Sequence, residues 1–236
     1  MCQSGPGEGE GKGRIDRRIA LKVLGGTLGM ASFVGCSSRS ITRRLPEPDW
    51  PSSTTPDLDL TPTPSVPGGK PTTFPNVQIR GTWAGAGPNY ANMNRMTPPR
   101  WITVHHDGMS VFQDKASGSA RDRLELIRTA HRNKGWGDIG YHYAIDPAGR
   151  IHACRPVTWQ GAHVKDWNEG NIAIVVLGNF DIQRPTRTQL WALKTHLANV
   201  RSFYKIPRKR VRGHKDWPGA KTACPGRYLH PQLRSV

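Results

Sequence analysis

Short apolar runs separated by turn residues predict four strands in the second half of the chain. The runs cover residues 101–105, 141–145, 150–153 and 172–177. The second and third flank Asp146-Pro147-Ala148-Gly149, a sequence typical of a hairpin turn. The fourth run is almost continuously apolar, as expected of a central strand that is covered on both faces.

Two further segments carry apolar residues at helical spacing. Residues 119–122 match a capping box, and one face of the helix that follows is marked by Leu124, Ile127 and Ala130–His131. Thr186 or Thr188 is expected to cap a second helix, which Pro207 ends. Its apolar face comprises Leu190, Leu193, Leu197, Val200 and Tyr204. Because strands and helices alternate, we predict an α/β domain in which a single mixed β-sheet is packed with helices.

The first 36 residues have the features of an export signal. Arg17 and Arg18 precede an apolar run at residues 23–35, as in a twin-arginine motif, and this run is too short to span a bilayer comfortably. Residues 33–37 are similar to a lipoprotein cleavage box with Cys36 as the acylated residue, although Phe33 replaces the usual small aliphatic residue. Plain cleavage near this point and an uncleaved anchor are the alternatives. We therefore expect an exported, membrane-anchored lipoprotein that faces the periplasm or the cell wall.

Residues 37–78 form a predicted linker between this signal and a domain at residues 79–236. Pro, Ser, Thr and Asp dominate the linker, and such a composition buries too little apolar surface to fold. Its prolines favour an extended tether. Glycines and a proline predict an irregular lead-in over residues 79–99.

The charge of the chain is strongly basic and unevenly distributed. Residues 1–75 hold 9 of the 34 Lys and Arg and 7 of the 17 Asp and Glu, so 25 basic and 10 acidic residues fall in residues 76–236. This field attracts polyanions such as an acidic cell-wall polymer. We expect no nucleic-acid partner, because neither a base-reading motif nor a basic helix with interleaved aromatics occurs. The four cysteines show no disulfide framework.

One turn-rich loop carries two candidate metal ligands. His214 and Cys224 stand ten positions apart in it, and both side chains are common zinc ligands. His105, at the end of the predicted strand 101–105, is the best candidate for a third ligand. Three protein ligands leave one zinc position for water, which is the catalytic rather than the structural arrangement. A zinc that only braces the fold is the alternative.

Three more motifs lie between these candidate ligands. They are DIGYHY at residues 138–143, GAH at 161–163 and NIAIVVLGNF at 171–180. With them, residues 98–230 resemble the zinc-dependent N-acetylmuramoyl-L-alanine amidases of the type-2 class, which share a fold with peptidoglycan recognition proteins and phage lysozyme-amidases. The resemblance implies an enzyme that uses Zn2+ to hydrolyse the amide between N-acetylmuramic acid and L-alanine in peptidoglycan. We expect a monomer. Muramyl peptides are then its partners.

The resemblance also implies roles for individual residues. His105, His214 and Cys224 match the zinc ligands, and His106 has no role. The remaining catalytic positions are Tyr141, Thr222 (or the adjacent Lys221) and His163, which lines the cleft, and each is a candidate donor to the reaction intermediate. The substrate walls are Trp159, Trp167 and Asn168. A non-catalytic peptidoglycan-binding module with a structural zinc is the alternative function. The presence of Cys224 favours an enzyme, because non-catalytic members lack the metal cysteine.

A basic run stands directly before His214. It comprises Lys205, Arg208, Lys209, Arg210 and Arg212. A solvated surface and a site that captures peptide-stem carboxylates or other wall anions are both compatible with this run.

Overall fold

The computed structural model describes residue 74 and residues 76–235. The predicted export signal with Cys36, and almost all of the predicted linker, lie outside the described residues. Within the described part, no helix combines the length and the apolar character that crossing a membrane requires.

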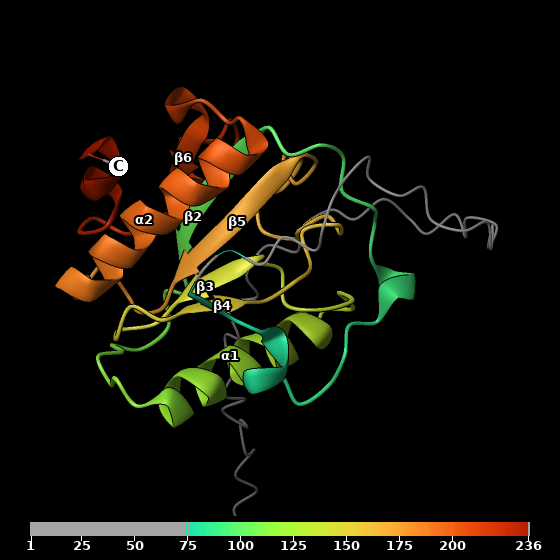
Figure 1. Cartoon of the computed structure of the whole chain (residues 1–236), viewed down its shortest axis with the longest axis horizontal. Coiled ribbons are helices and arrows are strands. Elements are labelled where there is room, and N and C mark those ends of the chain that lie inside the picture. Colours follow the sequence, from blue (N-terminus) through green and yellow to red (C-terminus); the bar gives the residue numbers. More distant parts are fainter. Residues whose placement is uncertain (1–73, 75, 236) are drawn as a thin grey trace, which may run out of the picture. The chain divides into compact units, whose positions relative to one another are not determined.

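A six-stranded mixed sheet forms the centre of the domain, as predicted (Figure 1). The strand order is β1-β4-β3-β5-β2-β6, and all neighbouring pairs are parallel except β3 and β4. The strands are β1 (Val77–Gln78), β2 (Trp101–His106), β3 (Tyr143–Ile145), β4 (Ile151–Ala153), β5 (Asn171–Val176) and β6 (Val211–Gly213).

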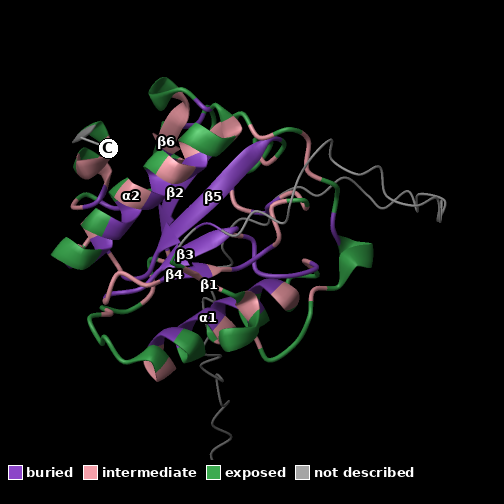
Figure 2. Ribbon diagram, viewed as in Figure 1, coloured by how far each residue is buried: buried purple, intermediate pink, exposed green. Residues whose placement is uncertain are grey.

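Strands β2 and β5 are the longest pair of the sheet. They run parallel, with Trp101 opposite Asn171 and His106 opposite Val176. Every residue of β5 is buried (Figure 2), which confirms the prediction of a central strand covered on both faces. Because paired residues point to the same face of a sheet, this register decides which side chains share a face with His105.

The two faces of the sheet pack against different helices. Helix α2 (Arg187–Tyr204) covers the face that carries Val104 and Ile174, through side chains such as Leu193. Helix α1 (Ser117–Arg132) covers the opposite face, where Leu124 and Ile127 contact the cluster around Ala144 and Val175. His105 pairs with Val175, so the histidine lies on the α1 face.

The ends of the two helices differ in how well the sequence predicted them. Thr186 caps α2 in a capping box with Gln189, as predicted. The capping box predicted at residues 119–122 is wrong, because α1 begins at Ser117 and the Ser119 hydroxyl donates to Asp114 instead. Ala130, predicted on the buried face, is exposed.

The folded domain begins before residue 79, which corrects the predicted linker boundary. Phe74 is buried, and its ring meets Tyr143, His196 and Phe203 edge to face. Val77 and Gln78 then add a parallel strand beside β4. One aromatic and one β-branched residue suffice to dock this segment, although the average composition of residues 37–78 is that of a linker.

Candidate functional site

The three predicted metal ligands meet on the α1 face of the sheet. β2 and β6 are parallel neighbours with Val104 opposite Gly213, so the next residues, His105 and His214, stand side by side. Their ring centroids are 4.8 Å apart. The Sγ of Cys224 lies 3.5 Å from Nδ1 of His105. One ligand atom from each of the three residues falls within 4.8 Å of the others.

Backbone contacts hold the cysteine against the two histidines. The N–H of Lys215 donates to the carbonyl of Cys224, and the N–H of His106 donates to its Sγ at 3.4 Å. Gly226 has φ +93°, and a Cβ there would lie 2.5 Å from the backbone of Phe180. The loop therefore needs glycine at this position to bring Cys224 close to β2.

His163 fixes the orientation of the His105 ring. Nε2 of His163 faces the carbonyl oxygen of Asn171 at 3.2 Å, and this acceptor requires the N–H on Nε2. Nδ1 of His163 is then an acceptor for the N–H on Nε2 of His105, at 3.0 Å. The Nδ1 lone pair of His105 consequently points toward Cys224. Such a hydrogen-bond chain behind a ligand is the arrangement that sets the tautomer of metal-binding histidines.

The protonation states suit a cation in this cluster. Burial lowers the pKa of His105 well below its ordinary value, with His163 adding to the effect, and lowers the pKa of His214 to about 4. Both rings are therefore neutral near pH 7 and offer lone pairs. Burial raises the pKa of Cys224 to about 12, so its thiolate needs a nearby cation to form. Two imidazoles and one thiol are a donor set that zinc accepts.

Tyr141 stands beside the cluster, two residues before the start of β3. Its ring centroid is 5.2 Å from that of His105 and 5.6 Å from that of His131. Burial raises the pKa of Tyr141, so its phenol stays protonated at neutral pH. The hydroxyl makes no hydrogen bond to any residue within the described range, and it remains free to donate to a ligand.

Thr222 and Lys221 differ in their surroundings. The Thr222 hydroxyl accepts the N–H of Cys224 at 3.1 Å, so its own proton remains available to donate. Lys221 is exposed and Thr222 half-buried. Of the two, only Thr222 is partly buried and hydrogen-bonded to the backbone of Cys224.

The three predicted substrate walls have unequal surroundings. Trp167 is 39% exposed and stacks against Trp217 at 5.0 Å between ring centroids. Trp159 lies between the ring of Tyr90, at 5.0 Å, and the guanidinium of Arg95, at 4.1 Å.

The side chain of the third predicted wall residue, Asn168, braces its own loop. Its oxygen accepts the backbone N–H groups of His163 and Val164, both at 2.9 Å. Substrate contact by Asn168 therefore rests on its remaining amide N–H groups.

A hydrogen-bond network that the sequence did not reveal joins the loop between His214 and Cys224 to strands β2 and β5 and to the loop at Trp167. The indole N–H of Trp217 donates to Thr103, which donates to Asn171, both at 2.9 Å. The amide nitrogen of Asn171 donates to the carbonyl of Trp167. No local pattern predicts these contacts, because they join segments up to 114 residues apart.

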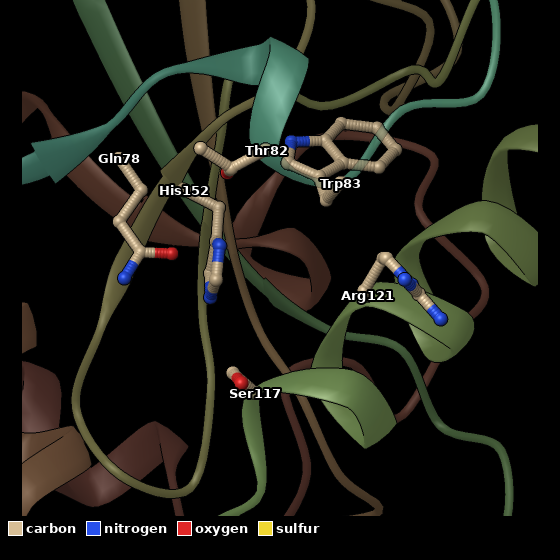
Figure 3. Close-up of a pocket in the computed structure, with 6 residues that line it drawn as sticks. All are labelled: Gln78, Thr82, Trp83, Ser117, Arg121 and His152. Atoms are coloured by element: carbon tan, nitrogen blue, oxygen red, sulfur yellow. The ribbon is translucent and has the colours of Figure 1, made fainter.

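A separate pocket of about 360 Å³ lies between α1, β4 and the segment 78–83 (Figure 3). The residues that line it are Gln78, Thr82, Trp83, Ser117, Arg121 and His152. Nε2 of His152 is 3.0 Å from the buried carboxylate of Asp146. None of the predicted site residues contributes to this pocket, so it is distinct from the His–His–Cys cluster.

The fold and the cluster together define an α/β domain with a His–His–Cys centre, and comparison with known proteins identifies its family. A family model described as N-acetylmuramoyl-L-alanine amidase matches residues 95–227. This match covers more than half of the chain, and the chain therefore belongs to that family.

Named relatives fall into two groups, amidases and recognition proteins. A pig (Sus scrofa) N-acetylmuramoyl-L-alanine amidase is 31% identical over 164 residues, which are 68% of this chain but only 27% of the pig protein. Peptidoglycan-recognition protein SC2 of Drosophila melanogaster is 29% identical over 137 residues, 57% of this chain and 72% of its own length. A Drosophila PGRP-LB mutant in complex with tracheal cytotoxin superposes with a TM-score of 0.61 at 25% identity, covering 68% of this chain and 94% of the other.

Proposed function

We propose that this chain is a zinc-dependent amidase that hydrolyses the bond between N-acetylmuramic acid and L-alanine in peptidoglycan. The observation that carries the proposal is the convergence of His105, His214 and Cys224, with ligand atoms within 4.8 Å, beside the free hydroxyl of Tyr141. Membership of a family whose relatives include named amidases supports the choice of bond.

The proposal gives a distinct task to each group around the cluster. His105, His214 and Cys224 would hold the zinc ion, which when bound lowers the pKa of its water to about 7 and polarises a carbonyl. The Tyr141 hydroxyl donates a hydrogen bond to the negative charge that develops on the carbonyl oxygen during attack. The Thr222 hydroxyl, two residues before Cys224, is a second donor.

His163 is proposed to act through His105. Its Nδ1 holds the His105 proton on Nε2, and this keeps the Nδ1 lone pair of His105 directed into the cluster. Because both nitrogens of His163 are engaged, it contributes to orientation before it can contribute a proton. Trp167, the more exposed of the two predicted tryptophan walls, offers an apolar face to the sugar or lactyl group.

Peptidoglycan recognition without hydrolysis is the second candidate function. The recognition proteins among the relatives favour it, and one relative's solved complex contains tracheal cytotoxin, a muramyl peptide. The two candidates differ in what the cluster must do. Hydrolysis needs a bound metal with an open position, whereas recognition needs only a surface that fits the muramyl peptide.

Mass spectrometry of digested sacculi decides between these functions. We expect the full chain to release free stem peptides that begin with L-alanine, and we expect a chelator to stop the release. Readdition of zinc should restore it. Binding to sacculi without any such release, at full zinc occupancy, would support the recognition module instead.

Changing His163 should affect metal affinity before it affects the fold. We expect His163→Ala to weaken zinc binding by about 10–100-fold, the usual effect of losing an outer partner of a ligand. His163→Asn should recover part of the affinity, because the amide oxygen of the new side chain can accept a hydrogen bond from the N–H on Nε2 of His105. Competition against a chromogenic chelator measures both values, and equal affinity of the wild type and the alanine variant would assign His163 a different role.

Export and lipid anchorage are proposed from the sequence of residues 1–36 alone. A lipoprotein carries two or three acyl chains, and at about 0.8 kcal/mol per buried CH₂ these give stable attachment to a membrane. We expect the mature protein from its native envelope to carry a diacylglyceryl group on Cys36, detectable as added intact mass. Cys36→Ala should release the protein from membranes. A mature protein without the lipid would instead be a soluble exported form.

A further inference from the structure

The chain contains a long segment without acidic residues. Residues 182–215 include ten Lys and Arg and no Asp or Glu. The densest part is the run identified above, which we call the basic track: Lys205, Arg208, Lys209, Arg210 and Arg212. Lys205, Arg208 and Lys209 are exposed, and the two other arginines are half-buried.

The two inner arginines of the track lie against tryptophan rings. The guanidinium of Arg212 is 4.5 Å from the centroid of Trp101 and 4.9 Å from that of Trp217, and that of Arg210 is 5.3 Å from Trp101. Among residues 76–235, neither arginine pairs with a carboxylate. Stacking orders a guanidinium while its N–H fork remains available to a bidentate anion.

The Arg212 end of the track shares a face of the sheet with the metal cluster. Arg212 is opposite Thr103, and Trp101 and His105 are the odd-numbered neighbours of Thr103 on the same strand. The rise over the four residue steps from Trp101 to His105 is about 13 Å along β2. Trp217, which donates to Thr103, lies between the two ends. A polymer that reaches the Arg212 end of the track would therefore lie on the same face of the sheet as the cluster.

We propose that the basic track binds a phosphodiester polymer attached to peptidoglycan, such as a teichoic acid, and so places the amidase on walls that carry it. This inference rests on the proposed function for its biological setting. Five cations within eight positions match a repeating anion better than the few carboxylates of one stem peptide. Single-stranded nucleic acid is disfavoured, because guanidinium groups already occupy the indole rings on which bases would stack.

The test measures binding alone, so it remains informative even if the chain has no amidase activity. The full chain is sedimented with teichoic-acid-bearing sacculi, either intact or stripped with hydrofluoric acid, which cleaves phosphodiesters. The track variant changes Arg208, Lys209 and Arg210 to Gln. The matched control changes three exposed residues outside the track, Lys115, Arg121 and Lys134, to Gln. It therefore alters the net charge by the same amount as the track variant. Melting temperature and zinc content verify that each variant is folded.

We expect the track variant to bind intact sacculi about 10-fold or more weakly and to lower the slope of log K against log salt by about 2–3. The control variant should bind intact sacculi like the wild type, and stripping should remove the difference between the three proteins. Equal losses in both variants would show that net charge alone matters and would overturn the proposal. A loss that persists on stripped sacculi would overturn it as well.

Discussion

Replacing Cys224 by serine is expected to remove tight zinc binding while the fold persists. A hydroxyl does not ionise near neutral pH, so the cluster loses its only anionic ligand and keeps two neutral imidazoles. We expect zinc affinity to fall by on the order of 10²-fold or more, beyond the 10–100-fold typical of an outer-shell change. Amidase activity should fall with occupancy. Metal analysis after dialysis against a weak chelator measures the effect.

Cys154→Ser is the matched control for this experiment. Cys154 is buried among the apolar residues beneath α1, a group that includes Ala144, and it lies outside the His–His–Cys centre. Cys154→Ser also replaces a buried thiol by a hydroxyl, but away from the proposed ligands. This variant should therefore retain about one zinc per chain. The assay belongs between pH 6 and 8, because burial lowers the pKa of His214 to about 4 and the imidazole is neutral throughout that range. Equal zinc retention in both variants would exclude Cys224 from the ligand set.

Periodicity alone predicted the long elements whose burial pattern is regular: a fully buried strand and a helix with one buried face. The apolar run 172–177 became β5, and the helical spacing from Leu190 to Tyr204 became α2 with its cap at Thr186. The start of α1 was mispredicted, because Asp114 binds the Ser119 hydroxyl and a local motif cannot indicate which of two partners a serine takes. The strand at Val77 was missed, because its stability comes from β4 and not from its own sequence.

In the candidate site, too, the sequence indicated the identity of the residues, whereas their orientation depends on contacts between distant segments. Residue type and position made His105, His214 and Cys224 candidate ligands, the family resemblance selected them as a set, and the structure brings their ligand atoms together. The orientation of His105 depends on a contact with His163, 58 residues away, and no pattern in either segment indicates it. The difference between Asn168, which braces a loop, and Trp167, which remains exposed, likewise depends on which backbone groups the fold places nearby.

Replacing Tyr141 by phenylalanine is expected to lower kcat by about 10²–10³-fold, the usual cost of removing one donor to a developing oxyanion. Zinc affinity should not change, because the phenol is not among the proposed ligands, and KM should change little. Burial raises the pKa of Tyr141, so the hydroxyl is protonated in the wild type across pH 6–9 and the ratio of the two kcat values should be constant there.

Tyr143→Phe is the control that separates chemistry from packing. This substitution also deletes a phenol hydroxyl, two residues further along the chain. Tyr143, however, is buried on the α2 face of the sheet, where it contacts Phe74 and His196. We therefore expect unchanged kcat for Tyr143→Phe, with any effect confined to stability. Turnover of a soluble muramyl peptide, followed by chromatography of the released stem peptide, gives both rates. If Tyr141→Phe retains the kcat of the wild type at equal zinc occupancy, the Tyr141 ring serves only to pack against His105, and the oxyanion donor must come from the Thr222 loop.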